Sequence, residues 1–392
     1  MISPHHFHPT NGDPRIQSKG ENGMKKIMTA IALTALCGAC FNLKKSPAEV
    51  RMDEKREAWE NGGRTEGLNW FRQNVYGINP VDRPADMEIG ENYVSMAGGK
   101  LKIRIHVSLP AGASAEKPVP VFVFGDHSNY HSSLPFREKT YEGIPTNSIT
   151  ARGYAYVTFN YNDVCPNTIR GKYLDEWKKG VFQIYGGANR TATSWGTIAA
   201  WAWGFSRVMD WIETRPELDS KRVAVLGHSR GGKTALWAAA QDERIALGIS
   251  NNSGCGGAKL NRMDLPSSEH IGQILRNFPF WFCLNFQKYI NADATVEHDQ
   301  DDLLRLIAPR LAYVASASED PWAGPKGEFE AARRASDIWR AYGKKGISLG
   351  AMPEPGKFDH GGSIGFHLRE GKHKLLPEDW KRFMDFADRH MR

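Results

Sequence analysis

The sequence predicts an α/β fold, with a largely parallel sheet wrapped by helices on both faces. Two observations indicate this class. Short apolar β-rich runs alternate with longer helical patterns along most of the chain. No linker, repeat or low-complexity segment interrupts the chain after residue 85. Buried continuous strands that alternate with helices are typical of parallel sheets covered on both sides.

Six runs are predicted as strands because they are apolar and rich in β-branched or aromatic residues: Val119–Phe124, Tyr154–Phe159, Val223–Leu226, Leu247–Ser250, Leu311–Ala315 and Ile347–Met352. The most prominent helical patterns between and after them cover Trp195–Thr214, Gly232–Asp242, Glu328–Tyr342 and Pro377–Met391. Pro377 suits the first turn of the last helix, where its missing N–H leaves no hydrogen bond unmade.

The first forty residues resemble an upstream extension followed by an export signal. From Met24 the chain reads MKKIMTAIALTALCGAC, with two lysines, an apolar run and then small residues. This order is typical of a secretory signal peptide, and the run is too short to span a bilayer permanently. We expect an exported protein whose mature chain starts near residue 40. Cys40 lies where a bacterial lipoprotein carries its lipid, and simple cleavage after Ala39 is the alternative.

Residues 41–85 are polar and broken by glycine and proline, so they are expected to form a tether or lead-in segment. Residues 86–392 are expected to form a single catalytic domain. Of the five cysteines, Cys165, Cys255 and Cys283 lie in the mature chain, and an odd set of three cannot pair completely. Their spacing matches no zinc site, and no metal or other cofactor is expected.

Composition limits the possible functions. The 392 residues are 41% hydrophobic and 24% charged, which is ordinary for a globular protein and excludes a disordered or collagen-like chain. The net charge of +7 arises from 51 basic and 44 acidic residues that are interleaved along the chain. Without a basic block, we expect no nucleic-acid partner. We expect a monomer.

The strongest motif is G-x-S-x-G over residues 227–231, between a predicted strand and a predicted helix. This context is typical of a nucleophile elbow, a tight turn that holds the Ser229 hydroxyl clear of the sheet. Bulky side chains at Gly227 and Gly231 would crowd such a turn. The following helix directs its N-terminal amides at the site, where they stabilise developing negative charge.

A serine needs a histidine base and an acid that orients it, here in the chain order serine, acid, histidine. Asp320 follows the predicted strand Leu311–Ala315 and is the favoured acid, with Glu319 as its competitor. His373, close before the last helix, is the favoured base. His360 and His367 lie in the same expected loop. They are expected to be either further site residues or structural histidines.

Several segments together resemble bacterial glucuronoyl esterases of carbohydrate esterase family 15. They include GHSRGGKTALWAAAQ, FPFWFCLNF, APRLAYVASASEDPWAG and SIGFHLREGKHKLLPEDW, and the similarity extends over most of residues 90–390. The resemblance implies an α/β-hydrolase fold. It also implies hydrolysis of the ester between 4-O-methyl-glucuronic acid of glucuronoxylan and lignin alcohols, through an acyl-enzyme on Ser229 and with His373 as the base.

The resemblance also implies roles for four further residues. Arg230, which follows the nucleophile, would donate hydrogen bonds to the oxyanion. Lys233 matches a lysine that holds sugar hydroxyls, Trp322 a tryptophan that packs on the sugar, and Glu269 a sugar-binding glutamate.

Two departures from the family pattern matter. Asn252 stands where many members carry the catalytic glutamate, so the acid must be Asp320, a position that some bacterial members use. His228 and Lys374 stand where fungal members have two cysteines that form a bridge across the site, so that disulfide is impossible here.

Two other functions remain open from sequence. An acetyl xylan esterase or other acyl esterase of the same fold would keep the catalytic residues and change the pocket. A surface glycan-binding protein on an inactive hydrolase scaffold is the non-enzymatic alternative, suggested by Asn252 and the possible lipid anchor.

Overall fold

The computed structural model describes residues 45–126, 144–166, 177–187 and 189–392. The predicted signal peptide and Cys40 lie outside these residues. The chain divides into two compact units, residues 1–50 and 51–392, and everything below concerns the larger one. Among the described residues, no helix is both long and apolar enough to cross a membrane.

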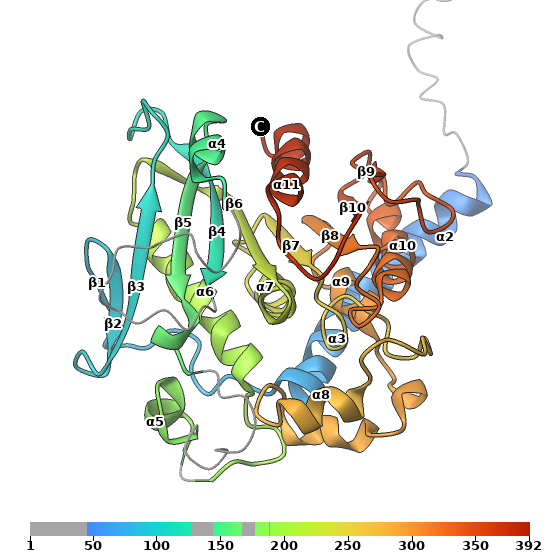
Figure 1. Cartoon of the computed structure of the whole chain (residues 1–392), viewed down its shortest axis with the longest axis horizontal. Coiled ribbons are helices and arrows are strands. Elements are labelled where there is room, and N and C mark those ends of the chain that lie inside the picture. Colours follow the sequence, from blue (N-terminus) through green and yellow to red (C-terminus); the bar gives the residue numbers. More distant parts are fainter. Residues whose placement is uncertain (1–44, 127–143, 167–176, 188) are drawn as a thin grey trace, which may run out of the picture. The chain divides into compact units, whose positions relative to one another are not determined.

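The described strands of the larger unit form a ten-stranded sheet in the order β1-β2-β3-β5-β4-β6-β7-β8-β10-β9 (Figure 1). The run from β5 to β10 is parallel, and β1, β2, β3 and β9 pair antiparallel at the two edges. The strands are β1 Glu88–Ile89, β2 Tyr93–Met96, β3 Leu101–Ser108, β4 Val119–Asp126, β5 Ala155–Asn160, β6 Leu218–His228, β7 Leu247–Asn251, β8 Leu311–Ala317, β9 Phe358–Asp359 and β10 Ile364–Arg369.

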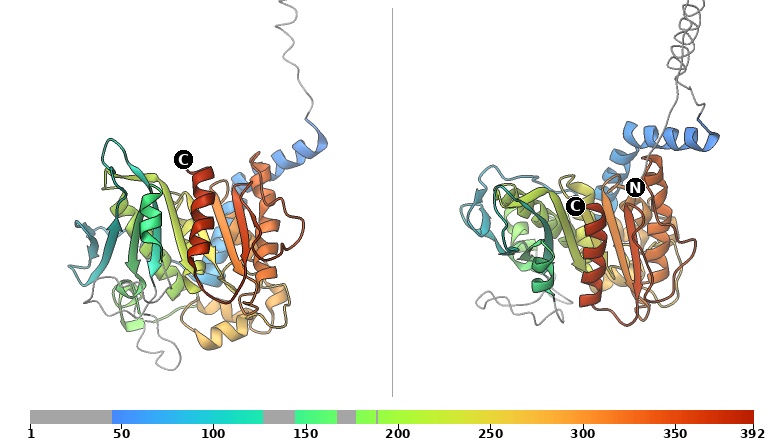
Figure 2. Two further views of the ribbon diagram at one scale, coloured as in Figure 1. Left: turned by 45° about the horizontal axis from the view of Figure 1, so that its top comes forward. Right: turned by 90° about the horizontal axis from the view of Figure 1, so that it is seen from above.

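Helices cover both faces of this sheet, as Figure 2 shows from two further directions. The α-helices are α2 Pro47–Ala58, α3 Arg64–Phe71, α4 Thr146–Ala151, α5 Val181–Tyr185, α6 Thr197–Ile212, α7 Arg230–Gln241, α8 Ile271–Asn277, α9 Gln300–Arg305, α10 Pro325–Ala341 and α11 Pro377–His390. One apolar core contains side chains of α6, α7 and α10, and a second, on the other face, contains those of α4 and α11. The predicted α/β class is therefore confirmed.

Five of the six predicted strands are present, and the sixth prediction is wrong. Ile347–Met352 has no strand structure; the amide of Ile347 donates to the Ser336 hydroxyl and that of Ser348 to the Asp359 carboxylate. Side chains therefore satisfy this backbone in place of a neighbouring strand. The place beside β8 is taken by β10, in a region that was predicted to be a loop.

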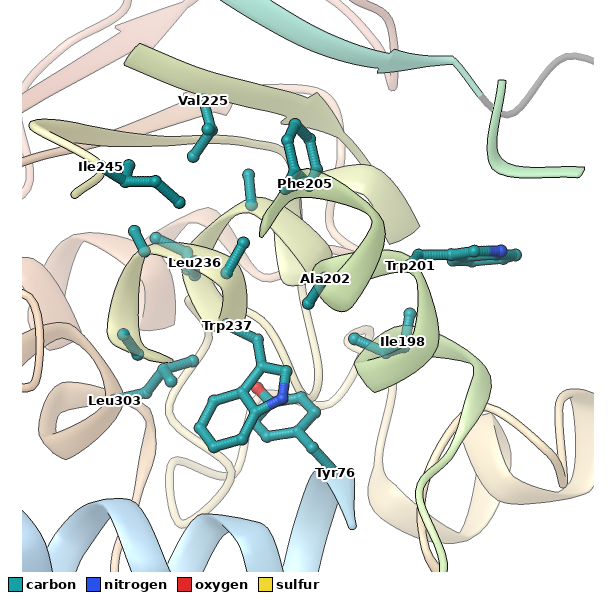
Figure 3. Close-up of a cluster of buried hydrophobic side chains, with 14 of the residues drawn as sticks. Tyr76, Ile198, Trp201, Ala202, Phe205, Val225, Leu236, Trp237, Ile245 and Leu303 are labelled. Carbon is teal, nitrogen blue, oxygen red and sulfur yellow. The ribbon is translucent and has the colours of Figure 1, made fainter. Parts of the chain in front are cut away.

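The segment expected to be a tether is largely part of the folded unit. Leu68, Phe71, Val75 and Tyr76 are buried in the first core, where the Tyr76 ring stacks on Trp237 with a centroid distance of 4.4 Å (Figure 3). Aromatic burial of this size anchors a chain firmly to a core. The expected boundary at residue 86 is therefore wrong, because the compact unit begins at Arg51.

In the described part of the larger unit, Cys165, Cys255 and Cys283 are buried and form no disulfide bond. Cys165, Cys255 and Cys283 therefore act as small apolar core residues rather than as crosslinks.

Candidate active site

The parallel strands end at one edge of the sheet, and the predicted catalytic residues follow them there. Ser229 follows β6, Asp320 lies just beyond β8, and His373 lies beyond β10. Asn252, which was not predicted to be catalytic, follows β7. Side chains at the carboxyl ends of neighbouring parallel strands converge on one crevice, which is where ligands bind in open α/β sheets.

Ser229 has the strained backbone of a nucleophile elbow. Its φ is 57° and its ψ is −121°, a conformation that residues other than glycine rarely adopt. A Cβ at Gly227 would lie 2.0 Å from the carbonyl oxygen of Gly231, so this position accepts only glycine. At Gly231 the nearest atom to a Cβ would be the Tyr161 hydroxyl at 3.3 Å, a milder restriction than expected.

A second glycine lets the helix approach the next strand. A Cβ at Gly232 would lie 2.9 Å from the Cβ of Ser253, in the loop after β7. The tight turn and this close approach place the N-terminus of α7, which begins at Arg230, directly behind the serine. The first amides of a helix have no partner within the helix and attract negative charge.

Asp320 and His373 are joined by a hydrogen bond of 2.6 Å between Oδ2 and Nδ1. Asp320 is buried, whereas the side chain of His373 is 41% exposed. Burial alone would raise the pKa of Asp320, but the hydrogen bond and charge of His373, with a further bond from Asn252, lower it below the ordinary value. The carboxylate is therefore ionised at neutral pH and orients the imidazole.

The structure separates the competing acid and bases. Glu319 is exposed and does not line the pocket described below. His367 lies on β10, where its Nε2 is 2.8 Å from Asp379 and its Nδ1 is 3.0 Å from the Tyr313 hydroxyl. His360 bonds the same hydroxyl at 2.7 Å. Both histidines therefore make structural contacts, and neither lines the pocket described below.

Asn252 takes a supporting position beside the acid. Its φ is 48°, and its Nδ2 donates to Oδ2 of Asp320 at 2.9 Å. That oxygen therefore receives both the Asn252 amide and the His373 imidazole. An amide in this place stabilises the carboxylate without adding a second negative charge.

One pocket, of about 340 Å³, contains all seven predicted site residues. Its described lining is Ser229, Arg230, Lys233, Asn252, Ser253, Gly254, Glu269, Phe278, Trp281, Asp320, Trp322, Ala323 and His373. The volume lies at the lower end of the range for small-molecule sites.

The Arg230 side chain is held by aromatic rings at one wall of this pocket. Its guanidinium lies 4.9 Å from the centroid of the Trp281 ring and 5.7 Å from that of Phe278. The two rings are themselves stacked, 3.7 Å apart. A guanidinium packs well on aromatic faces, so the two rings fix its position at this wall.

Lys233 is buried, and most of its hydrogen-bonding capacity is already used. Its ammonium group donates to the carbonyl oxygens of Ser253 and Cys255, the latter at 2.6 Å. Since an ammonium has three protons, one donor is left for a ligand in the pocket. Lys233 therefore also ties the loop after β7 to helix α7. Burial lowers its pKa, against the opposing charge of Glu269.

Glu269 and Trp322 lie together at the same pocket. The Glu269 amide donates to the Trp322 carbonyl at 2.9 Å. Burial raises the pKa of the Glu269 carboxyl, and the charge of Lys233 partly offsets this. Trp322 is 45% exposed, so its indole has a free face toward solvent.

Two supporting residues were not predicted. Arg369, at the end of β10, donates to the carbonyls of Glu370, Lys372 and Lys374, which flank His373 in the chain. A charged residue that ends a buried apolar run was the sequence signal available for it. The second is Glu328, fully buried in α10, which accepts hydrogen bonds from Ser316, Ser253 and the Gly254 amide.

Within the part of the chain that the structure describes, no group of three or more His, Cys, Asp or Glu side chains is arranged to hold a metal ion.

The fold and this site together define an α/β-hydrolase with a serine, histidine and aspartate at the carboxyl edge of its sheet. Residues 93–343 match the family model described as fungal glucuronyl esterase. The chain belongs to the glucuronoyl esterase family.

Curated relatives and solved structures agree with this assignment. A carbohydrate esterase from an unknown prokaryotic organism is 43% identical over 244 residues, which are 62% of this chain and 54% of that protein. A 4-O-methyl-glucuronoyl methylesterase of Phanerochaete carnosa is 33% identical over 49% of this chain and 47% of its own. The chain thus spans about half the length of these curated relatives.

Among solved structures, a promiscuous esterase of carbohydrate esterase family 15 from a marine bacterial metagenome has a TM-score of 0.73 at 33% identity, covering 86% of this chain and 93% of its own. The Solibacter usitatus glucuronoyl esterase has a TM-score of 0.73 at 32% identity, covering 85% and 93%. A Sporotrichum thermophile enzyme in complex with methyl 4-O-methyl-β-D-glucopyranuronate has a TM-score of 0.61 at 25% identity, covering 83% and 80%.

Proposed function

We propose that this protein is a serine esterase that hydrolyses the ester between 4-O-methyl-D-glucuronic acid of glucuronoxylan and lignin alcohols. The observation that carries the proposal is the single pocket in which Ser229, Asp320 and His373 lie with the buried charges of Lys233 and Glu269. A site for acyl transfer alone needs no such charges, whereas sugar hydroxyls require buried polar partners.

In the proposed reaction, His373 takes the proton of the Ser229 hydroxyl, which attacks the ester carbonyl. Asp320 holds the imidazole through Nδ1 and stabilises the imidazolium that forms. The protonated His373 then gives its proton to the departing alcohol. Water, activated by the same imidazole, releases the glucuronate and restores the serine.

Arg230 is the proposed oxyanion residue. Its backbone N–H directly follows the nucleophile, as in other elbows, and its guanidinium is held at the same pocket. Donors fixed before the reaction stabilise developing charge most effectively, because no reorganisation is needed when the charge appears. The negative charge on the tetrahedral intermediate therefore falls beside two donors of one residue.

Lys233, Glu269 and Trp322 are the proposed sugar-binding residues. The remaining Lys233 donor and the Glu269 carboxyl can bond ring hydroxyls, and the exposed face of Trp322 can stack on the C–H surface of the sugar. The relative solved with a methyl glucuronate derivative supports this substrate class.

The proposed location is outside the cytoplasm, as a periplasmic, outer-membrane or secreted protein. The lysines, apolar run and small residues from Met24 to Cys40 support export, and Cys40 as a lipidated residue remains part of this proposal.

The test compares two esters under equal conditions: benzyl glucuronate and p-nitrophenyl acetate. The proposal predicts a clear preference for the glucuronate ester in kcat/KM, and loss of both activities in Ser229→Ala. A strong preference for acetate would identify an acyl esterase of the same fold. Retention on xylan with no turnover of either ester would identify a glycan-binding protein.

A further inference from the structure

A second imidazole lies against the proposed general base. The rings of His228 and His373 have centroids 4.6 Å apart, and their planes are inclined at 47°. His228 is the last residue of β6 and directly precedes Ser229. The ring of His228, which precedes the nucleophile, therefore packs against His373, the proposed base that acts on Ser229.

Among the described residues, the only side-chain hydrogen bond of His373 is the one to Asp320. It lies between β10 and α11, in a stretch without helix or strand structure, and its side chain is 41% exposed. The Asp320 bond fixes Nδ1, but a single hydrogen bond leaves the ring able to turn about that contact. Catalysis requires Nε2 to face Ser229, so the plane of the ring must also be held.

His228 is itself held rigidly by the sheet. Its side chain is buried, and its Nδ1–H donates to Oδ1 of Asn251 at 2.6 Å. Asn251 is the residue paired with His228 in the register of β6 and β7. The ring that His373 contacts therefore belongs to a residue of the central sheet.

His228 is also neutral at working pH. Burial, followed by the charge of the neighbouring His373, lowers the pKa of His228 to about 3. Its neutral ring can contact His373 in both protonation states without the repulsion that a second positive charge would bring.

We infer that His228 is a positioning residue that holds the plane of the His373 imidazole, so that Nε2 stays aligned with Ser229 through both proton transfers. The inference rests on the proposed function, because it assigns His373 the role of general base. It predicts that the ring of His228, rather than its hydrogen bond, supports catalysis.

Two variants separate the ring from the hydrogen bond. His228→Phe keeps a neutral ring and loses the donor to Asn251, whereas His228→Gln keeps a donor and loses the ring. We expect His228→Gln to lower kcat for benzyl glucuronate about tenfold or more with KM within about twofold, and His228→Phe to keep kcat within about threefold. Thermal midpoints should show the opposite order, with His228→Phe the less stable variant.

The inference would be overturned if the variant with the lower thermal midpoint also had the lower kcat. A folded His228→Gln variant with the kcat of the parent would overturn it as well, whether or not His228→Phe folds. The same variants are measured on p-nitrophenyl acetate, which also needs the base. If the parent protein hydrolyses only the acetate ester, the proposed substrate is overturned, and the kcat values of the His228 variants on acetate decide the role of His228. If the parent hydrolyses neither ester, both proposals are overturned.

Discussion

At the scale of single residues, the Asp320 carboxylate connects the proposed base His373 with Asn252 and with the Ala323 amide. Its Oδ2 accepts from His373 Nδ1 at 2.6 Å and from Asn252 Nδ2 at 2.9 Å, while Oδ1 accepts from the Ala323 amide at 3.3 Å. These three hydrogen bonds stabilise the buried carboxylate and offset the free-energy cost of removing its charge from water. Asn252 is therefore a hydrogen-bond donor to the proposed catalytic acid in this chain.

Replacement of Asp320 should abolish most activity. Asp320→Asn keeps the shape of the side chain but loses the charge that stabilises the imidazolium. We expect kcat to fall about a thousandfold or more, measured by glucuronate release at pH 7. The matched control is Glu319→Gln, which removes an exposed carboxylate from the neighbouring position and should leave kcat unchanged. Equal losses in the two variants would contradict the assignment of the acid.

Removal of Trp322 should affect sugar binding and spare the chemistry. Trp322 is 45% exposed, so Trp322→Ala leaves no core cavity. We expect KM for benzyl glucuronate to rise about tenfold, which corresponds to roughly 1.4 kcal/mol of lost stacking. Hydrolysis of p-nitrophenyl acetate should change little, because acetate has no ring to stack. Parallel losses on both esters would show that Trp322 shapes the pocket generally.

At the scale of elements, β10, the loop after it and α11 form one unit that presents His373. Arg369 ends β10 and donates to three carbonyls of the loop, and Asp379 in the first turn of α11 accepts from Arg369 at 3.1 Å and from the Leu376 amide at 2.7 Å. Both charged groups are almost fully buried. The pair therefore binds strand, loop and helix together.

Loss of Arg369 should destabilise this unit. Arg369→Met leaves Asp379 buried without its cationic partner, and we expect the free energy of unfolding to fall by about 3 to 5 kcal/mol, measured by urea denaturation. Activity should fall as well, since the His373 loop loses three hydrogen bonds. Arg382→Met provides a control, because Arg382 lies over the exposed ring of Phe358 and should cost little. Similar losses in both variants would contradict this role of Arg369.

The elements differ in how far the sequence predicted them. The elbow strand, its helix and α11 were predictable because apolar periodicity, the G-x-S-x-G turn and Pro377 act locally. Strand β10 was missed because His367 and Arg369 interrupt its apolar run. Their burial is possible only through Asp379 and Tyr313, which are distant partners that no local pattern reveals.

The site was predicted more completely than the fold around it. All seven proposed residues line one pocket. Ser229, Asp320 and His373 were proposed from their places after predicted strands and before the last helix, and the other four were proposed from the family resemblance. The hydrogen bonds of Arg369 to the His373 loop, the hydrogen bond of Asn252 to Asp320 and the ring contact of His228 with His373 were not predicted. No local sequence pattern indicates these contacts.

At the scale of the whole molecule, one buried acid makes the stability of the fold depend on pH. Glu328 is fully buried in α10, and burial raises its pKa from 4.5 to about 7, although hydrogen bonds from Ser316 and Gly254 partly offset the shift. In the unfolded chain the carboxyl loses its proton near pH 4.5. Ionisation therefore favours the unfolded state as the pH rises from 4.5 to 7.

The Glu328→Gln variant should remove this dependence. Glutamine resembles the protonated acid and carries no titratable group. Relative to the variant, the parent should lose about 2 to 3 kcal/mol of unfolding free energy between pH 5 and pH 8, measured by urea denaturation at both values. A constant difference between the two proteins across this range would contradict a raised pKa for Glu328.

The arrangement of the whole molecule also explains why the site needs no crosslink. The proposed nucleophile and its acid and base all follow parallel strands in the centre of one sheet, and both faces of that sheet are covered by apolar cores. Close packing of such cores fixes the ends of the strands relative to one another. Hydrogen bonds from Asn252 and Arg369 then position the loops that extend beyond them.

The most direct test of the proposed mechanism is the rate of glucuronate release from benzyl glucuronate by the purified protein, measured beside Ser229→Ala and His373→Ala. We expect turnover by the parent and loss of several orders of magnitude in both variants, with folding unchanged by circular dichroism. Turnover that persists in Ser229→Ala would show that this serine does not form the acyl-enzyme.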